Sequence, residues 1–117
     1  MRVEADLFSG RPNPSFTLDT GQADALSALL RGLTPGGEPR EPPGLGYRGF
    51  VVRDASAALP GCTELRAFHG VVSADCGGER RLLADPGRTV ERRLMELGRA
   101  HLEPGVYDAI QSELGQP

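Results

Sequence analysis

The segment Ser9–Pro14 combines residue types that could bind a ligand or a partner protein. Two prolines favour an extended backbone here and a glycine permits a sharp turn, so Arg11 and Asn13 are held in a nearly fixed arrangement. A preorganised guanidinium beside a side-chain amide can bind a carboxylate, a phosphate or the backbone of another protein. The segment therefore predicts a binding site formed by Ser9, Arg11 and Asn13.

A purely structural interpretation of the same segment stays open. In that interpretation the side chain of Asn13 hydrogen-bonds the nearby backbone, as in an Asx turn, and Arg11 pairs with Asp6 or Glu4. Such a loop would need no ligand to be stable.

The two cysteines and two histidines are the residues that could hold a metal ion. Cys62, His69 and Cys76 are evenly spaced, and His101 lies further along the chain. Structural zinc sites bring their ligands in pairs two to four residues apart, because one turn then presents both. The spacing of these residues is wider than that, so we expect no metal site.

Whether Cys62 and Cys76 can form a disulfide depends on the path of the chain between them. A single straight strand over Glu64–Ala74, with about 3.3 Å per residue, would hold the two cysteines roughly 40 Å apart. A hairpin turned at His69 and Gly70 would instead bring them face to face. The alternation of apolar residues favours the straight strand, and a cytoplasmic location argues against a disulfide.

A small enzyme is the rival interpretation of the same residues. On a straight strand, His69 could act as an acid or base, with Arg48 or Arg53 of a neighbouring strand binding an anion. Cys76 is a weaker candidate nucleophile, since His69 in mid-strand could not reach it as a base. The sequence contains no phosphate-binding loop, dinucleotide fingerprint, nucleophile elbow or zinc-protease motif, and we expect no cofactor.

Composition and charge exclude several classes of protein. The 117 residues suit one domain, spanning 1–117, and no run approaches the ~20 apolar residues of a membrane span. The net charge of −3, the absence of Trp and the 5% aromatic content disfavour nucleic-acid binding. Thirteen arginines without a lysine indicate a high-GC bacterial genome, and the N-terminus has no secretory pattern, so we expect a cytoplasmic protein.

Hydrophobic periodicity predicts the order ββαβββαα. Asp19 and Gln22 form a capping-box pattern that begins a helix ending near Gly32. We expect strands at 2–7, 15–18, 46–53, 64–74 and 80–84, and further helices beginning at Asp85 and at Pro104. This order predicts an α+β fold with an antiparallel sheet of about five strands and two to three helices packed on one face.

The helix predicted to begin at Asp85 carries a mixed-charge pattern. Its apolar stripe consists of Val90, Leu94, Leu97 and His101. We expect a solvated face made of the remaining charged residues Arg88, Glu91, Arg92, Arg93, Glu96 and Arg99.

A Pro- and Gly-rich segment, Thr34–Gly46, is either a second binding loop or a spacer. Because it and Ser9–Pro14 flank the same predicted helix, we expect a small accessory domain that binds a protein or peptide through these two loops. Self-association through an exposed sheet edge is a further possibility for such a fold.

Overall fold

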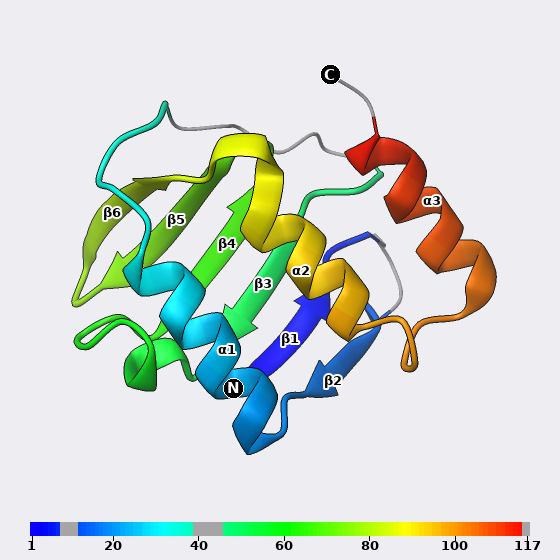
Figure 1. Ribbon diagram of the computed structural model, residues 1–117, viewed down its shortest axis with the longest axis horizontal. Helices are drawn as coiled ribbons and strands as arrows, with labels where there is room; N and C mark the ends of the chain where they lie inside the picture. The colour runs from blue at the N-terminus through cyan, green and yellow to red at the C-terminus, as the bar shows by residue number, and fades with distance from the viewer. Residues whose placement is uncertain (8–11, 39–45, 116–117) are drawn as a thin grey trace.

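The computed structural model describes residues 1–7, 12–38 and 46–115, and its centre is a six-stranded antiparallel sheet (Figure 1). The strands follow one another across the sheet in the order β2-β1-β3-β4-β5-β6. Their bounds are β1 Arg2–Ala5, β2 Ser15–Thr17, β3 Phe50–Arg53, β4 Glu64–Phe68, β5 Val71–Cys76 and β6 Glu79–Ala84. From β3 onward the sheet is a simple meander, in which each strand pairs with the next.

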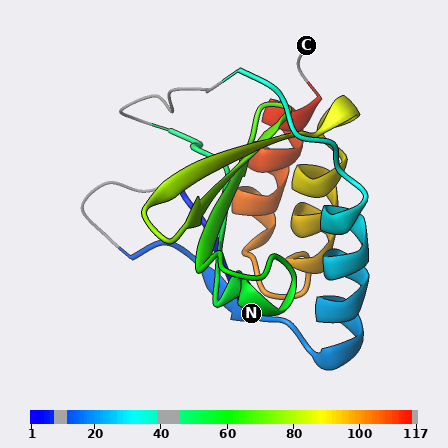
Figure 2. The ribbon, with the colours of Figure 1, turned by 90° about the vertical axis from the view of Figure 1, so that its left-hand side faces the viewer.

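Three α-helices, α1 (Thr20–Arg31), α2 (Thr89–Leu97) and α3 (Pro104–Leu114), lie on one side of this sheet (Figure 2). Short 3₁₀ turns, η1 (Ala55–Ala57) and η2 (Pro86–Arg88), precede β4 and α2. The α+β class and the packing of the helices on one face are confirmed, with one strand more than expected.

The alternation in β1 explains which of its residues enter the core. Val3 and Ala5 are fully buried, while Arg2 and Glu4, which alternate with them along the strand, are more exposed. Successive side chains of a strand point to opposite faces, so the charged residues lie on the face without helices, which we call the open face. The capping box of Asp19 and Gln22 is confirmed at the start of α1, and Gly32 ends that helix.

The expected straight strand at 64–74 is wrong, because His69 and Gly70 turn the chain into the β4–β5 hairpin. Both residues have positive φ angles, of 57° and 88°, which is the backbone twist that two-residue hairpin turns require. The reversal places Leu65 and Ala67 on the same face as Val72 and Ala74. His69 therefore lies exposed on a turn and not in mid-strand.

The expected solvated face of α2 is also partly wrong. Glu91 is completely buried, and the buried residues of this helix are Val90, Glu91, Leu94 and Met95. His101, which was expected on the apolar stripe, is exposed and stacks against Phe16 with ring centroids 5.1 Å apart. Arg92, Arg93 and Glu96 are exposed as expected.

The remaining boundaries differ in detail. The strand expected at 46–53 begins only at Phe50. Asp85 does not directly precede α2, but its carboxylate accepts hydrogen bonds from the backbone N–H groups of Val90 and Glu91 in the first turn of that helix. One core cluster joins the sheet to all three helices, and the radius of gyration of 13.2 Å matches the value of about 13 Å for a compact chain of this length. None of the described helices is long and apolar enough to cross a membrane.

One edge strand of the sheet, β2, is short, and the other, β6, is partly covered. β2 has three residues and follows Pro14. At the other edge, the Ala84 N–H donates to the Thr34 carbonyl and the Gly36 N–H donates to the Leu82 carbonyl, so one half of β6 is paired.

Candidate functional site

Asp6, directly after β1, is the centre of a charged network on the open face. Its carboxylate is almost completely buried and accepts hydrogen bonds from two arginines. Arg48 Nη2 lies 2.7 Å from Oδ1, and Arg66 Nη1 lies 2.7 Å from Oδ2. Arg66 Nη1 also donates to the Arg48 carbonyl oxygen, at 2.7 Å, so the three residues form one unit.

Asn13 connects the first predicted loop to this network. The Leu7 N–H donates to Asn13 Oδ1 at 3.0 Å, which confirms the expected bond to the nearby backbone. The amide nitrogen of Asn13 donates to Glu4 at 3.1 Å and to Asp6 at 3.2 Å. Asn13 thus holds the end of the loop against two carboxylates of the open face.

The two arginines decide the ionisation of Asp6. Burial alone would raise the pKa of this carboxyl, but the hydrogen bond and charge of Arg66, together with those of Arg48, outweigh burial. The pKa of Asp6 therefore lies below its ordinary value, and the group is ionised at neutral pH.

Backbone hydrogen bonds bring the C-terminal end of each predicted loop to Asp6 or its neighbour Ala5. The Ala5 N–H donates to the Pro14 carbonyl, at the end of the first loop. The Asp6 N–H donates to the Gly49 carbonyl and the Arg48 N–H donates to the Asp6 carbonyl, just beyond the second loop. The two segments that the sequence singled out therefore lie beside one another at their C-terminal ends, whereas Thr34–Gly36, at the start of the second, pairs with β6.

The described residues include part of each loop. Ser9 and Arg11 lie outside the described residues, and so does the stretch 39–45 of the Thr34–Gly46 segment. Of the first-loop site residues, Asn13 is the one that the structure describes, and it is bound to the Asp6 network. Asp6 itself pairs with Arg48 and Arg66, which the sequence did not indicate as its partners.

A second polar network, around the buried Glu91, was not expected from the sequence. Arg88 donates to both carboxylate oxygens of Glu91, each at 2.8 Å. The Tyr47 hydroxyl and the His69 N–H donate to the same carboxylate. Glu91 thereby joins α2 to the β4–β5 turn and to the chain before β3.

The chemistry of this second network is that of a structural connection. Burial and the charge of Glu91 raise the pKa of the Tyr47 phenol far above its ordinary value, so the hydroxyl remains a donor. The hydrogen bond to Glu91 raises the pKa of Arg88. Arg88 and Arg92 also donate to the Glu113 and Leu114 carbonyls, which fastens the end of α3 to α2.

The residues proposed for an enzyme do not form a connected set. Arg48 is bound to Asp6, whereas Arg53 is paired with Glu4 and Glu64 at the opposite end of β3 from the His69 turn. No hydrogen bond or ion pair between described residues joins the His69 side chain to either arginine. Cys76 has no free thiol, because it is bonded to Cys62.

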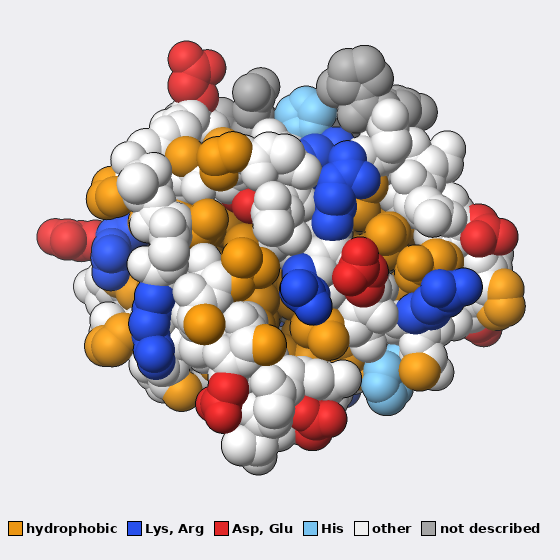
Figure 3. Space-filling view, in the orientation of Figure 1, with side chains coloured by type: hydrophobic (Ala, Val, Ile, Leu, Met, Phe, Trp, Pro, Cys, Tyr) orange, Lys and Arg blue, Asp and Glu red, His pale blue; other side chains and the backbone are white. Residues whose placement is uncertain are grey.

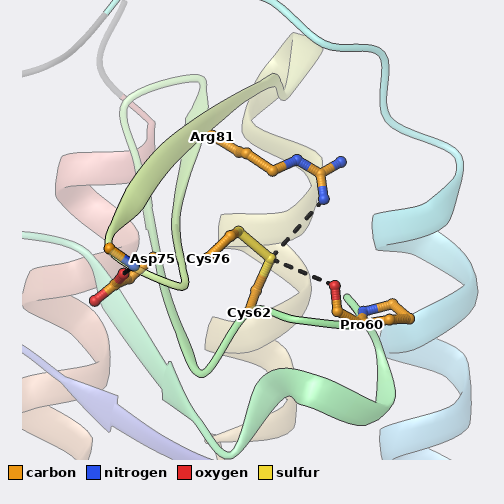
Figure 4. The surroundings of a disulfide bond; sticks show 6 residues. Pro60, Cys62, Asp75, Cys76 and Arg81 are labelled. Atoms are coloured by element: carbon orange, nitrogen blue, oxygen red, sulfur yellow. Dashed lines mark hydrogen bonds between the residues drawn. A yellow bond between two sulfur atoms is a disulfide. The ribbon is translucent and has the colours of Figure 1, made fainter.

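The Cys62–Cys76 disulfide overturns the expectation that these residues stay unpaired (Figure 4). The hairpin at His69 and Gly70, which the sequence left as the alternative path, is the reason. It brings Cys76, at the end of β5, beside Cys62, just before β4. Within the described part of the chain, no group of three His, Cys, Asp or Glu side chains could hold a metal ion.

Described residues form surface cavities on the helical side of the molecule. One, of about 350 Å³, lies between the end of α1 and the start of α2 and is lined mainly by apolar side chains, including Leu29, Leu33 and Pro86. In Figure 3, hydrophobic side chains gather on this face between the two helices. Another, of about 310 Å³, lies between the chain that follows α2 and the first turns of α3, and it is lined by Arg99, which stacks over Tyr107.

Comparison of the chain with family models, with curated proteins and with solved structures finds no match at a significant level. The geometry of its own residues is therefore the basis for interpreting the site.

From the sequence, Asp6 was expected only as a partner of Arg11, and no structural role was expected for Arg66 or Glu91, which organise these networks with Asp6. A signal for Glu91 was present, because Glu91 and Met95 stand beside Val90 and Leu94 at the same four-residue spacing. No comparable signal marked Arg66, whose role follows from the pairing of β3 with β4.

Proposed function

We propose that this chain is a small binding domain that recognises a protein or peptide partner through Ser9–Pro14 and Thr34–Gly46. The observation that carries the proposal is that the C-terminal end of each segment lies against Asp6, since Asn13 and Arg48 both donate to its carboxylate. A buried carboxylate held by two arginines and an asparagine fixes these ends firmly. Loop ends that are already fixed on a sheet have less conformational entropy to lose when a partner binds.

The chemistry of the chain favours a protein partner over a nucleic acid. Its net charge is −3, and three of the described open-face arginines, Arg48, Arg53 and Arg66, are already paired with carboxylates. A nucleic-acid surface would need an excess of cations free to displace counterions from phosphates. The rival enzyme interpretation has no specific support from the geometry of His69, Arg48 and Arg53.

The proposal is tested by replacing Arg11 and Asn13 with alanine and comparing the proteins recovered with the tagged domain from its source cells. We expect a partner recovered with the wild-type domain to be lost from the double variant. Because Asn13 also supports the Asp6 network, the single variant Arg11→Ala separates lost recognition from a disturbed loop. Thermal unfolding establishes that each variant is folded.

A matched control changes two exposed charges on the opposite side of the molecule. Arg93→Ala with Glu96→Ala alters the solvent face of α2 and leaves both loops intact. This variant should recover the same partner as the wild type. Equal recovery by the Arg11 variants and the control variant would refute recognition through the first loop.

The cytoplasmic location expected from the sequence remains a prediction, and the disulfide gives it a direct test. Disulfides persist in oxidising compartments, whereas cytosolic thiols are kept reduced. If the protein is cytoplasmic, we expect Cys62 and Cys76 to be alkylated when the source cells are quenched in acid and treated with N-ethylmaleimide. Mass spectrometry that recovers the cysteines oxidised would assign the protein to an oxidising compartment.

Self-association through a sheet edge also remains a proposal. The half of β6 at Glu79–Arg81 is the stretch of this edge that Thr34–Gly36 does not pair with.

A further inference from the structure

The two sulfurs of the Cys62–Cys76 disulfide have different surroundings. Cys62 is completely buried, whereas Cys76 is half-buried at the end of β5. In thiol–disulfide exchange a thiolate attacks one sulfur while the other leaves, so access decides which sulfur is attacked. Attack on Cys76 requires no opening of the core, and attack on Cys62 does.

The charged residues near the disulfide also differ between its two sulfurs. Arg81 Nη1 lies 3.9 Å from Cys62 Sγ, and Figure 4 shows this guanidinium extending from β6 toward the sulfur. Glu79 is the direct cross-strand partner of Cys76 and lies on the same side of the sheet. A thiolate that forms on Cys62 is therefore stabilised by a cation in contact with it, whereas the cross-strand neighbour of Cys76 is an acidic residue.

We propose that this disulfide is a site of thiol–disulfide exchange, at which an external thiol modifies Cys76 and Cys62 leaves as a thiolate beside Arg81. The thiolate of the external molecule forms a bond to Cys76 Sγ as the Cys62–Cys76 bond breaks, and the electron pair of the broken bond stays on Cys62. A second thiol then attacks the external sulfur of the mixed disulfide and releases the Cys76 thiolate. In total, two external thiols are oxidised to a disulfide and the protein disulfide is reduced. This role is independent of partner binding through the loops.

The fold allows the exchange to proceed without global unfolding. The β4–β5 hairpin is paired from Glu64–Asp75 to Phe68–Val71, and neither cysteine takes part in this pairing. The Cys62 N–H is bound to the Leu59 carbonyl, and the Pro60 carbonyl oxygen lies 4.0 Å from Cys62 Sγ. Once protonated, the Cys62 thiol can donate to that oxygen, so the reduced state is also accommodated.

The proposal is tested on the full chain with 2-mercaptoethanol as the external thiol. The reaction is quenched in acid before completion, free thiols are alkylated, and the protein is cleaved with trypsin. Arg66 lies between the two cysteines, so the cleavage places Cys62 and Cys76 on separate peptides. We expect the mercaptoethanol adduct on the Cys76 peptide and the alkyl group on the Cys62 peptide.

The rate of reduction tests the role of Arg81. Arg81→Gln should slow the reaction about five-fold, because the leaving thiolate loses its neighbouring cation. Arg80→Gln removes the same charge from the adjacent residue, which points to the opposite face of the sheet, and should leave the rate unchanged. Arg81→Lys keeps the charge and should restore most of the rate.

Three outcomes would overturn the proposal. The first is an adduct found on Cys62 or equally on both cysteines. The second is equal rates for Arg81→Gln and Arg80→Gln. The third is a reduction rate that follows the urea dependence of global unfolding, which would mean that the disulfide reacts only in the unfolded chain.

Discussion

Replacing Glu91 with alanine is expected to lower the free energy of unfolding by about 4 kcal/mol, since one partner of a buried ion pair is removed. The side chain of Arg88 is 13% exposed and would lose both of its bonds to the carboxylate. The Tyr47 hydroxyl and the His69 N–H would lose their acceptor as well. Urea denaturation followed by circular dichroism measures the loss.

The size of this effect follows from what the Glu91 carboxylate connects. His69 has a left-handed backbone, which is uncommon for a residue other than glycine, and Glu91 binds its N–H. Without this acceptor the β4–β5 turn loses a contact that favours its conformation. Arg88, which also has a left-handed backbone, would lose the partner that orients it at the start of α2.

Two further variants make the experiment specific. Glu96→Ala removes an exposed carboxylate from the same helix and should change the unfolding free energy by less than about 0.5 kcal/mol. Glu91→Gln keeps the shape and one acceptor oxygen, so its loss should be smaller than that of Glu91→Ala. A loss for Glu91→Ala within the range of Glu96→Ala would show that the network does not stabilise the fold.

The same residues explain why the sequence predicted the fold class and yet missed the β4–β5 hairpin. The two-residue alternation of apolar residues continues across His69 and Gly70, so periodicity alone predicts one continuous strand. Asn-Gly or Asp-Gly would have marked a two-residue turn, and His-Gly is a much weaker signal. The Glu91 carboxylate that holds the turn comes from a helix 22 residues away, and such a contact leaves no local pattern.

The candidate site was predictable in part for a similar reason. Asn13 accepts a hydrogen bond from the backbone N–H of Leu7, six residues away. A bond to the nearby backbone was expected because asparagine commonly forms one in a loop and because prolines flank this residue. The bond from Arg66 to Asp6 spans 60 residues and depends on the pairing of β1 with β3 and of β3 with β4. The pattern of residue types along the chain does not show which strands pair, so it could not predict this bond.

Replacing Asp6 with asparagine is expected to lower the free energy of unfolding at neutral pH by about 2 kcal/mol, because two partly exposed arginines lose their counter-charge. Arg48 would lose the charged side-chain acceptor of its Nη2, and its Nε is already buried without a hydrogen-bond partner among the described residues. Glu64→Gln on the same face is the matched control. Its carboxylate pairs with Arg53, but it is 44% exposed, and the loss should be below about 0.5 kcal/mol.

The pH dependence of this loss distinguishes a charge effect from a packing effect. The pKa of Asp6 in the folded chain lies below its unfolded value of about 3.9, so the unfolded chain binds the proton more readily. The stabilisation by Asp6 is therefore complete above the unfolded pKa and is lost as the pH falls through the folded pKa. The difference between wild type and Asp6→Asn should stay constant from pH 7 to about pH 5 and shrink at lower pH. A difference that persists unchanged in strong acid would mean that Asp6 acts through its shape and not through its charge, and that the ion pairs with Arg48 and Arg66 do not fix the ends of the two loops.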